Sequence, residues 1–267
     1  MRQLSLAFAF SLFAVCSIHA GPEPLSSGKE TKTVAPAPAP TCFNWSGFYA
    51  GAFGGYKLSV VDLDLSLGGT WDTLFPVGKD FVLAHAPGDL EYGGAEAGGL
   101  VGYNFQWNCW VLGAEVDAGY LWARDSDFRG KFINPPAIGD FDIRTSFKTH
   151  YLLTAAPRFG YAIGHWLPYI TGGLAYGDLE FRQELPFRPS SNSVQRGDSG
   201  DANIGWMLGG GLQYALTDHW SIRAQYQFID LGSTEFHSKF YADPTTYGDQ
   251  EAELHEHNIS VAVMYKF

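Results

Sequence analysis

Three carboxylates are the strongest candidates for residues that could do chemistry. Glu96, Glu115 and Asp117 lie in segments where two kinds of residue alternate, on the side that is small or polar. If that side faces an interior, these carboxylates could act as a general acid and a general base. A structural reading competes, because charges in a narrow interior need partners of opposite sign. We expect a salt-bridge network between these acids and three bases, Lys57, Arg158 and Arg223.

Two histidines could bind a metal ion. His255 and His257 are two residues apart, so on a strand they share one face, as metal ligands could, while Glu256 points the other way. The alternative is that both belong to a solvated rim beside a loop. Only one other cluster, His237 with Ser238, lies nearby, and we expect no metal ion and no other cofactor.

A third group could support hydrolysis. Lipid-modifying enzymes can use a histidine, a serine and an acid together, and Glu235, His237 and Ser238 are the one adjacent trio of this kind. The trio falls in one expected loop, where no pattern fixes its geometry. The glycines follow strand alternation and form no convincing phosphate-binding loop. We therefore expect that the protein is not an enzyme.

The composition indicates which class of protein carries these residues. The 267 residues include 17 Lys and Arg against 28 Asp and Glu, a net charge of −11. Such an acidic chain is unsuited to nucleic acid, which binds basic surfaces. Charged residues make up 17% of the chain and aromatic residues 16%, whereas soluble domains have roughly 25% charged residues. Few charges, many aromatics and no mature apolar segment of ~20 residues suit a membrane β-barrel.

The segment Trp110–Trp122 shows the alternation most clearly. Its even-numbered residues are all apolar, and its odd-numbered residues include Glu115, Asp117 and two glycines. Tryptophan begins and ends the apolar face. A strand tilted by about 45° needs ~9–11 residues to cross a bilayer, and tryptophan prefers the membrane–water interface. The segment therefore predicts a membrane-spanning strand.

The same period-two pattern occurs eight times and predicts an all-β fold. We expect an eight-stranded antiparallel up-and-down transmembrane β-barrel. The expected strands are Trp45–Leu58, Ala95–Trp107, Trp110–Trp122, Tyr151–Ile163, Trp166–Phe181, Ile204–Leu216, Trp220–Asp230 and Leu254–Phe267. Three connections are short turns, and four are long loops at about 59–93, 123–147, 182–202 and 232–252. Short periplasmic turns and long extracellular loops are typical of bacterial barrels.

Aromatic residues should form a ring at each membrane interface. Five tryptophans lie beside short turns or at the start of the first strand and should form the periplasmic ring: Trp45, Trp107, Trp110, Trp166 and Trp220. Four other residues should approach the opposite interface: Tyr56, Trp122, Tyr176 and Trp206. A secreted lipocalin-like barrel is the alternative fold. It would have to crowd nearly every large aromatic side chain inside an eight-stranded barrel, so we favour the membrane orientation.

The N-terminus predicts export. Arg2 precedes an apolar run over 4–15, and Ala20 ends a small-residue cleavage site, so residues 1–20 read as a signal peptide. Residues 21–41 are rich in Pro and Ala and predict a periplasmic linker. The barrel then occupies residues 42–267.

Two cysteines remain after cleavage, in an oxidising compartment that favours a disulfide. Cys42 precedes the first strand, and Cys109 lies in the turn between the second and third strands. Both positions should lie at the periplasmic end, so we expect the two residues to be bonded. The alternative is a pair of free thiols.

The last strand carries an expected insertion signal. It alternates to the end of the sequence, and its final aromatic residues are Tyr265 and Phe267. An aromatic last residue behind such a strand is how outer-membrane barrels are recognised for insertion. We therefore expect the outer-membrane insertion machinery to be a partner.

These segments resemble the small outer-membrane β-barrel, or porin-like, family of Gram-negative bacteria. That family groups the transmembrane domain of outer membrane protein A with opacity-type surface antigens and hemin-binding proteins. The matching stretches are Asn44–Gly51, Gly102–Gln106, Gly113–Asp117, Leu167–Tyr176, Tyr226–Gly232 and Asn258–Phe267. Departures are Gln213 and Gln225, where relatives often have acids, and Ala156-Pro157, where we expect a bulge or a missing ladder bond.

The resemblance implies an outer-membrane location, in contact with lipid and lipopolysaccharide, and leaves function open. We expect a structural or surface-interaction role through the extracellular loops, with the lumen plugged by the charged network. The alternatives are a small-solute porin, a surface binder of heme or another ligand, and a lipid-modifying enzyme.

Overall fold

The structure is a computed structural model that describes residues 42–74, 76–86, 88–122, 128–132, 141–148, 150–186, 194–240 and 245–267. The predicted signal peptide at 1–20 and the predicted linker at 21–41 lie outside these residues. The elements are β1 (Gly47–Gly68), α1 (Thr70–Thr73), α2 (Pro76–His85), β2 (Asp89–Trp107), β3 (Trp110–Trp122), β4 (Phe128–Phe132), β5 (Phe141–Lys148), β6 (Tyr151–Tyr161), β7 (Trp166–Pro186), β8 (Val194–Ala215), β9 (Trp220–Phe240) and β10 (Tyr247–Lys266).

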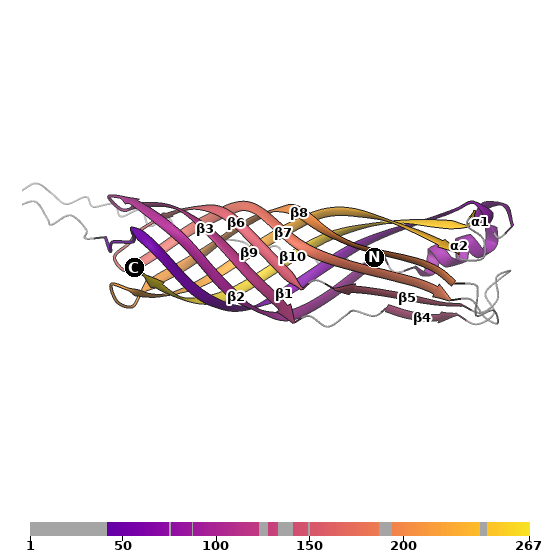
Figure 1. Ribbon diagram of the computed structural model, residues 1–267, viewed down its shortest axis with the longest axis horizontal. Helices are drawn as coiled ribbons and strands as arrows, with labels where there is room; N and C mark the ends of the chain where they lie inside the picture. The colour runs from indigo at the N-terminus through magenta and orange to yellow at the C-terminus, as the bar shows by residue number, and fades with distance from the viewer. Residues whose placement is uncertain are drawn as a thin grey trace, which may run out of the picture. The chain divides into compact units, whose positions relative to one another are not determined.

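Eight strands close into an antiparallel barrel (Figure 1). Around the ring the order is β1, β2, β3, β6, β7, β8, β9 and β10, and β10 pairs with β1 to close it. The other two strands, β4 and β5, form a hairpin that joins the ring through pairing of β5 with β7. The predicted fold class is therefore confirmed.

The two ends of the barrel differ. The short connections after β2, β6 and β8 lie at one end, which we call the turn end, together with the C-terminus (Figure 1). Asn108 and Gly164 in these turns have φ values of 54° and 57°, which Asn and Gly adopt more readily than other residues. The opposite part, which we call the extension, comprises residues 61–68, 178–186, 194–202, 231–240 and 247–254.

Between the turn end and the extension the outer wall is apolar, as a lipid-facing wall must be. Outward-facing residues that are more than 40% exposed include Phe48, Val101, Leu112, Leu153, Ile170, Leu208 and Val261. Within the described residues, no helix has the length and apolar character needed to cross a membrane.

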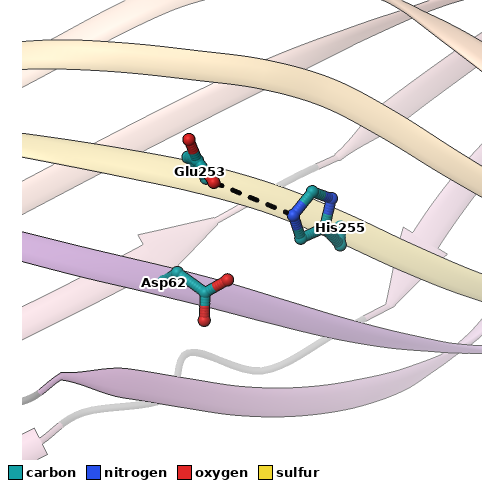
Figure 2. A group of neighbouring side chains, drawn as sticks. All are labelled: Asp62, Glu253 and His255. Atoms are coloured by element: carbon teal, nitrogen blue, oxygen red, sulfur yellow. Dashed lines mark ion pairs between the residues drawn. The ribbon is translucent and has the colours of Figure 1, made fainter.

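In the parts of the extension that belong to β1 and β10, the two faces exchange character. Val61, Leu63 and Leu254 are buried, whereas Asp62 and Glu253 lie on the outer wall (Figure 2). An apolar inside and a polar outside are typical of a sheet whose outer face meets water. The predicted bounds of the long loops, 59–93, 123–147, 182–202 and 232–252, are therefore too wide, because part of each is strand. The loss of outward apolar residues marks where lipid contact ends, and the strands continue past it.

Pro157 interrupts one ladder, as predicted. β6 and β7 pair at Ala155 with Leu174 and again at Arg158 with Thr171, without a change of register. β6 and β7 do not pair at Ala156 and Pro157, and Pro157 has no backbone N–H to donate. The Thr171 hydroxyl instead donates to the Pro157 carbonyl oxygen at 2.9 Å.

Candidate functional site: the charged barrel interior

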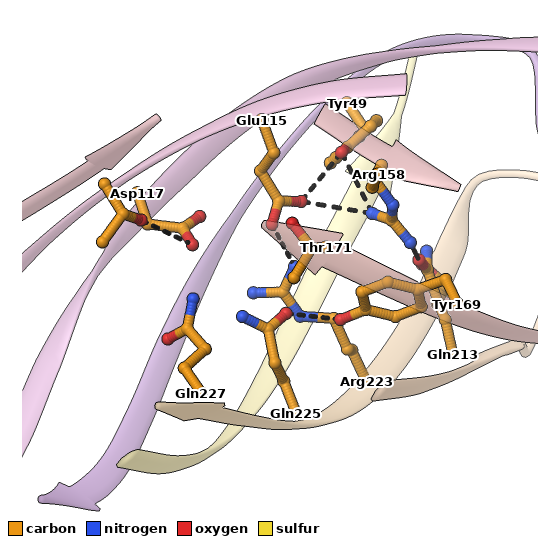
Figure 3. A network of polar contacts seen from close by, with 12 residues as sticks. Tyr49, Glu115, Asp117, Arg158, Tyr169, Thr171, Gln213, Arg223, Gln225 and Gln227 are labelled. Carbon is orange, nitrogen blue, oxygen red and sulfur yellow. Dashed lines mark hydrogen bonds and ion pairs between the residues drawn. The ribbon is translucent and has the colours of Figure 1, made fainter. Parts of the chain in front are cut away.

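Glu115 on β3 lies between two arginines inside the barrel (Figure 3). Its Oε2 is 3.2 Å from Nη1 of Arg158 on β6, and its Oε1 is 2.5 Å from Nη1 of Arg223 on β9. Strand alternation turns all three side chains inward, and all three are buried. Because β3 and β9 are opposite one another in the ring, the pair of Glu115 with Arg223 crosses the lumen.

Tyr49 and Gln213 complete the hydrogen bonding around Arg158. The Tyr49 hydroxyl donates to Glu115 Oε2 at 2.8 Å and accepts from Arg158 Nη1 at 3.0 Å. Gln213 Oε1 accepts from Arg158 Nη2 at 2.8 Å. Charge-assisted hydrogen bonds of this kind are stronger than neutral ones, so the arginine is held at a fixed position.

Tyr169 forms the opposite side of this group. The Arg158 guanidinium lies 4.1 Å from the centre of its ring, close enough for a cation–π contact. The Tyr169 hydroxyl donates to Gln225. Glycines make room for both tyrosine rings, because a Cβ atom at Gly102 would clash with Tyr49 and one at Gly211 with Tyr169.

A second charged group surrounds Lys57 on β1. Its Nζ donates to Glu256 Oε2 on β10 at 3.1 Å and lies 3.7 Å from Glu96 Oε2 on β2. The Ser59 hydroxyl donates to Glu256 Oε1 at 3.4 Å. The sequence analysis did not include Glu256 among the interior acids. The signal that could have found it is alternation, because Glu256 shares the inward face of β10 with Asn258.

The six predicted network residues are all buried, but the structure divides them. Arg158, Arg223 and Glu115 form one group, and Lys57 and Glu96 belong to the other. In the described part of the chain Asp117 forms no ion pair, and its Oδ2 accepts a hydrogen bond from Thr154 at 3.4 Å. Glu96, Glu115 and Asp117 are at most 8% exposed. In this arrangement the three carboxylates form ion pairs or hydrogen bonds that connect neighbouring or opposite strands.

Apolar side chains pack on both sides of the charged groups. The cluster at the turn end contains Trp45, Val111, Ala162, Leu167 and Ala215. The cluster toward the extension contains Val61, Leu63, Tyr92, Leu152, Ala156, Ala175, Met207, Ile229, Leu231, Ala252 and Leu254. Buried polar groups thus lie between two apolar clusters.

The predicted place of Trp45 in the aromatic ring is wrong. Its side chain is 3% exposed and belongs to the turn-end cluster. The backbone N–H of Trp45 donates to Gln106 Oε1 at 2.7 Å, and the backbone N–H of Phe43 donates to the Gly164 carbonyl oxygen at 3.0 Å. Trp45 precedes β1, so strand alternation does not fix its direction. We call residues 42–46 the entry segment.

The predicted disulfide is confirmed. Cys42 and Cys109 are bonded, with their Cα atoms 5.7 Å apart. The bond ties the entry segment to the turn between β2 and β3, which explains how a segment outside the strands is held inside the barrel mouth.

The other members of the predicted rings face outward. Trp107, Trp110, Trp166 and Trp220 are between 46% and 70% exposed and lie beside the turns. Tyr56, Trp122, Tyr176 and Trp206 are between 48% and 60% exposed. At the C-terminus, the Tyr265 ring contacts the Trp220 and Phe267 rings, and Phe267 is 75% exposed.

The three residues considered as a possible hydrolytic group are not assembled. Glu235, His237 and Ser238 lie on β9, not in a loop, and alternation separates them. Glu235 and His237 are exposed, whereas Ser238 is buried and its hydroxyl donates to the Gly248 carbonyl oxygen at 2.9 Å. His237 pairs with Asp249 on β10.

His255 and His257 share the outer face of β10, as alternation predicted. The alternative of a rim beside a loop is wrong, because both lie in a strand that pairs on both sides. Nδ1 of His257 is 2.8 Å from the Tyr226 hydroxyl.

Comparison with known proteins identifies the family. Residues 33–267 match the outer membrane protein beta-barrel domain. The chain is 25% identical to the 31 kDa outer-membrane immunogenic protein of Brucella melitensis biotype 1, over 100% of each chain. It is also 25% identical to the 25 kDa outer-membrane immunogenic protein of Brucella abortus biovar 1, over 87% of this chain and 85% of that protein.

A solved structure also aligns with most of the chain. The outer membrane protein OprG from Pseudomonas aeruginosa is 16% identical, with a TM-score of 0.45 over 83% of this chain and 96% of that one. The family match covers the whole closed ring, and both relatives are named as outer-membrane proteins. The chain is therefore an outer-membrane protein that belongs to the outer membrane protein beta-barrel domain family.

Proposed function

We propose that this protein is a closed barrel that acts at the cell surface through its extension and does not conduct solutes. One observation carries the proposal: the Glu115 carboxylate on β3 pairs with Arg158 on the neighbouring strand and with Arg223 on the opposite wall of the barrel. An eight-stranded barrel is only wide enough for side chains to fill its interior. A bridge across that interior leaves no path for a hydrated solute.

The turn end supports the same proposal. The entry segment lies in the barrel mouth and is tied there by the Cys42–Cys109 bond. A cavity of about 10 Å³ remains beside Trp45 and Tyr49, near the minimum volume that holds one water molecule. A sugar cannot enter a cavity of this size.

We infer that the turn end faces the periplasm and the extension projects from the cell. Short turns are periplasmic in bacterial barrels, and the outer wall changes from apolar to acidic where the extension begins. Two relatives are named as immunogenic outer-membrane proteins, which supports exposure at the surface. In this arrangement lipid and lipopolysaccharide contact the wall, and the exposed Phe267 is available to the insertion machinery.

Solute flux tests the proposal. Liposomes that contain the purified protein should swell in small sugars no faster than protein-free liposomes. Swelling that is faster and falls with the size of the sugar would overturn the proposal and support a small-solute porin.

A further inference from the structure

Two carboxylates and a histidine meet on the outer wall of the extension, where the first and last strands pair (Figure 2). Asp62 on β1 is directly opposite Glu253 on β10, and His255 follows Glu253 on the same face. One nitrogen or oxygen atom from each of the three side chains lies within 4.8 Å of the others. These atoms are of the types that bind metal ions, at a spacing that one ion could span.

The surrounding charges favour a cation here. Like charges directly opposite one another destabilise a pair of strands, yet the next row repeats the arrangement, with Asp64 opposite Glu251 and Glu251 opposite Glu235. Across the described residues, none of these acids pairs with Lys or Arg. A hollow of about 470 Å³ lies over the second row, so the wall is both acidic and accessible.

The strand geometry orients His255 as a metal ligand. Between Glu253 and His255 the register of β10 with β9 shifts by one residue, and Gly232 on β9 takes a φ of 72° that suits such a bulge. The Gly232 N–H donates to Asp230 Oδ1 at 2.8 Å. This leaves Asp230 Oδ2 at 3.9 Å from Nδ1 of His255, a nitrogen that is shielded from solvent and has no hydrogen bond to any described residue.

The other ring nitrogen of His255 points toward the acids. Its Nε2 lies 4.0 Å from Glu253 Oε2. Histidines that bind metals almost always have a carboxylate, carbonyl or water at the second nitrogen, which fixes the tautomer and makes the first nitrogen a better ligand. Asp230 is the carboxylate on that side of the ring, and its Oδ2, 3.9 Å from Nδ1, would accept this hydrogen bond after a small movement of either side chain. This arrangement is independent of the acidic row and separates the group from an ordinary cluster of surface acids.

We propose that Asp62, Glu253 and Nε2 of His255 bind a divalent transition-metal ion such as Zn²⁺. One imidazole and two carboxylates form a donor set that Zn²⁺ accepts, whereas Ca²⁺ and Mg²⁺ take oxygen ligands. The three side chains leave a fourth position for water or for an external group. The ion would neutralise the facing acids and join β1 to β10, the two strands whose pairing closes the barrel.

Titration of the untagged full-length protein in detergent with ZnCl₂ tests the site. We expect one Zn²⁺ per chain, and at least tenfold weaker binding in His255→Ala, Asp62→Asn and Glu253→Gln. Asp230→Asn, which changes a positioning residue, should weaken binding by about 10–100-fold and keep the stoichiometry. The matched control is His257→Ala, two residues away on the same face, which should bind within twofold of the wild type.

Stability provides a second readout. Samples are heated to increasing temperatures before electrophoresis, and the temperature at which the folded band is lost is recorded. Zn²⁺ should raise this temperature in the wild type and in His257→Ala. It should leave the temperature unchanged in His255→Ala and Asp62→Asn. Migration of each variant without heating shows that it has folded. The assignment is overturned by the absence of saturable binding, or by unchanged binding in His255→Ala. It is also overturned if His257→Ala or His237→Ala weakens binding as much as His255→Ala.

Discussion

At the scale of single residues, we expect the Glu115 carboxylate to contribute strongly to the stability of the barrel. It accepts from two arginines and one tyrosine, so removal of a partner leaves charge without compensation in a buried place. Removing one member of a buried ion pair lowers stability by about 3–5 kcal/mol.

We predict that Arg223→Met lowers the free energy of unfolding by roughly this amount, about 3–5 kcal/mol. Urea titration, followed by the folded band on an unheated gel, measures it. The double variant Glu115→Gln/Arg223→Met should lose less than the sum of the two single variants, because the residues share one interaction. Strictly additive losses would show that the pair is not coupled.

The disulfide supports a second prediction at this scale. Cys109→Ser should still fold, because the strands do not need the bond to pair, but it should be less stable by at most about 2–4 kcal/mol. The same gel assay measures the change, and Cys42→Ser should give the same value. A variant that fails to form the folded band would show that the entry segment is needed for the barrel to form.

Which residues face inward could be predicted from the sequence, and which of them pair could not. Alternation alone places Lys57, Glu115 and Arg158 inside. The choice of partner depends on the width of the ring and on the register across it, which a single strand does not contain. This is why Glu115 and Arg223, from opposite walls, could only be proposed as one of several pairs.

At the scale of elements, inward glycines set how closely the tyrosines approach the strands. A Cβ atom at Gly102 on β2 would meet Tyr49 and would lie 2.8 Å from the Ala114 carbonyl oxygen. We predict that Gly102→Ala lowers the free energy of unfolding by about 1–3 kcal/mol, because an overpacked interior must shift. Gly99→Ala is the matched control on the same strand.

Gly99 faces outward, and a Cβ atom there has its nearest neighbour, the Gly51 carbonyl oxygen, at 3.7 Å. The control should therefore change stability by no more than about 0.5 kcal/mol. Equal losses in the two variants, measured by urea titration, would contradict the packing argument.

The elements inside the membrane could be predicted from the sequence, and the extension could not. Apolar residues facing lipid give a clear signal from Phe48 to Tyr56, for example. From Val61 onward the apolar residues of β1 lie on the inner face, as at Val61 and Leu63. A strand end that is predicted from the last outward apolar residue therefore falls before the end of the actual strand. The prediction for Trp45 was wrong for a different reason. Trp45 precedes β1, and the entry segment that contains it is held by the disulfide and not by strand pairing.

At the scale of the whole molecule, the proposed orientation predicts which positions are accessible from outside the cell. Lys239 lies on the extension and Thr217 in a turn, and both are exposed. A cysteine in place of Lys239 should react with a membrane-impermeant maleimide on intact cells. A cysteine in place of Thr217 should react only after the outer membrane is permeabilised.

Cys42 and Cys109 are bonded to each other, so the wild-type protein supplies the unlabelled control. If the Thr217→Cys variant is labelled on intact cells and the Lys239→Cys variant is not, the barrel has the opposite orientation to the one proposed.

Single-channel recording in planar bilayers tests the closed lumen most directly. The wild-type protein should show no steady conductance, because in the proposed closed barrel the Glu115 network bridges the interior. The variant Glu115→Ala/Arg158→Ala/Arg223→Ala should show measurable openings, and Glu251→Gln, which removes a charge from the outer wall, should behave as the wild type. A steady, size-selective conductance in the wild-type protein would contradict the proposed closed barrel.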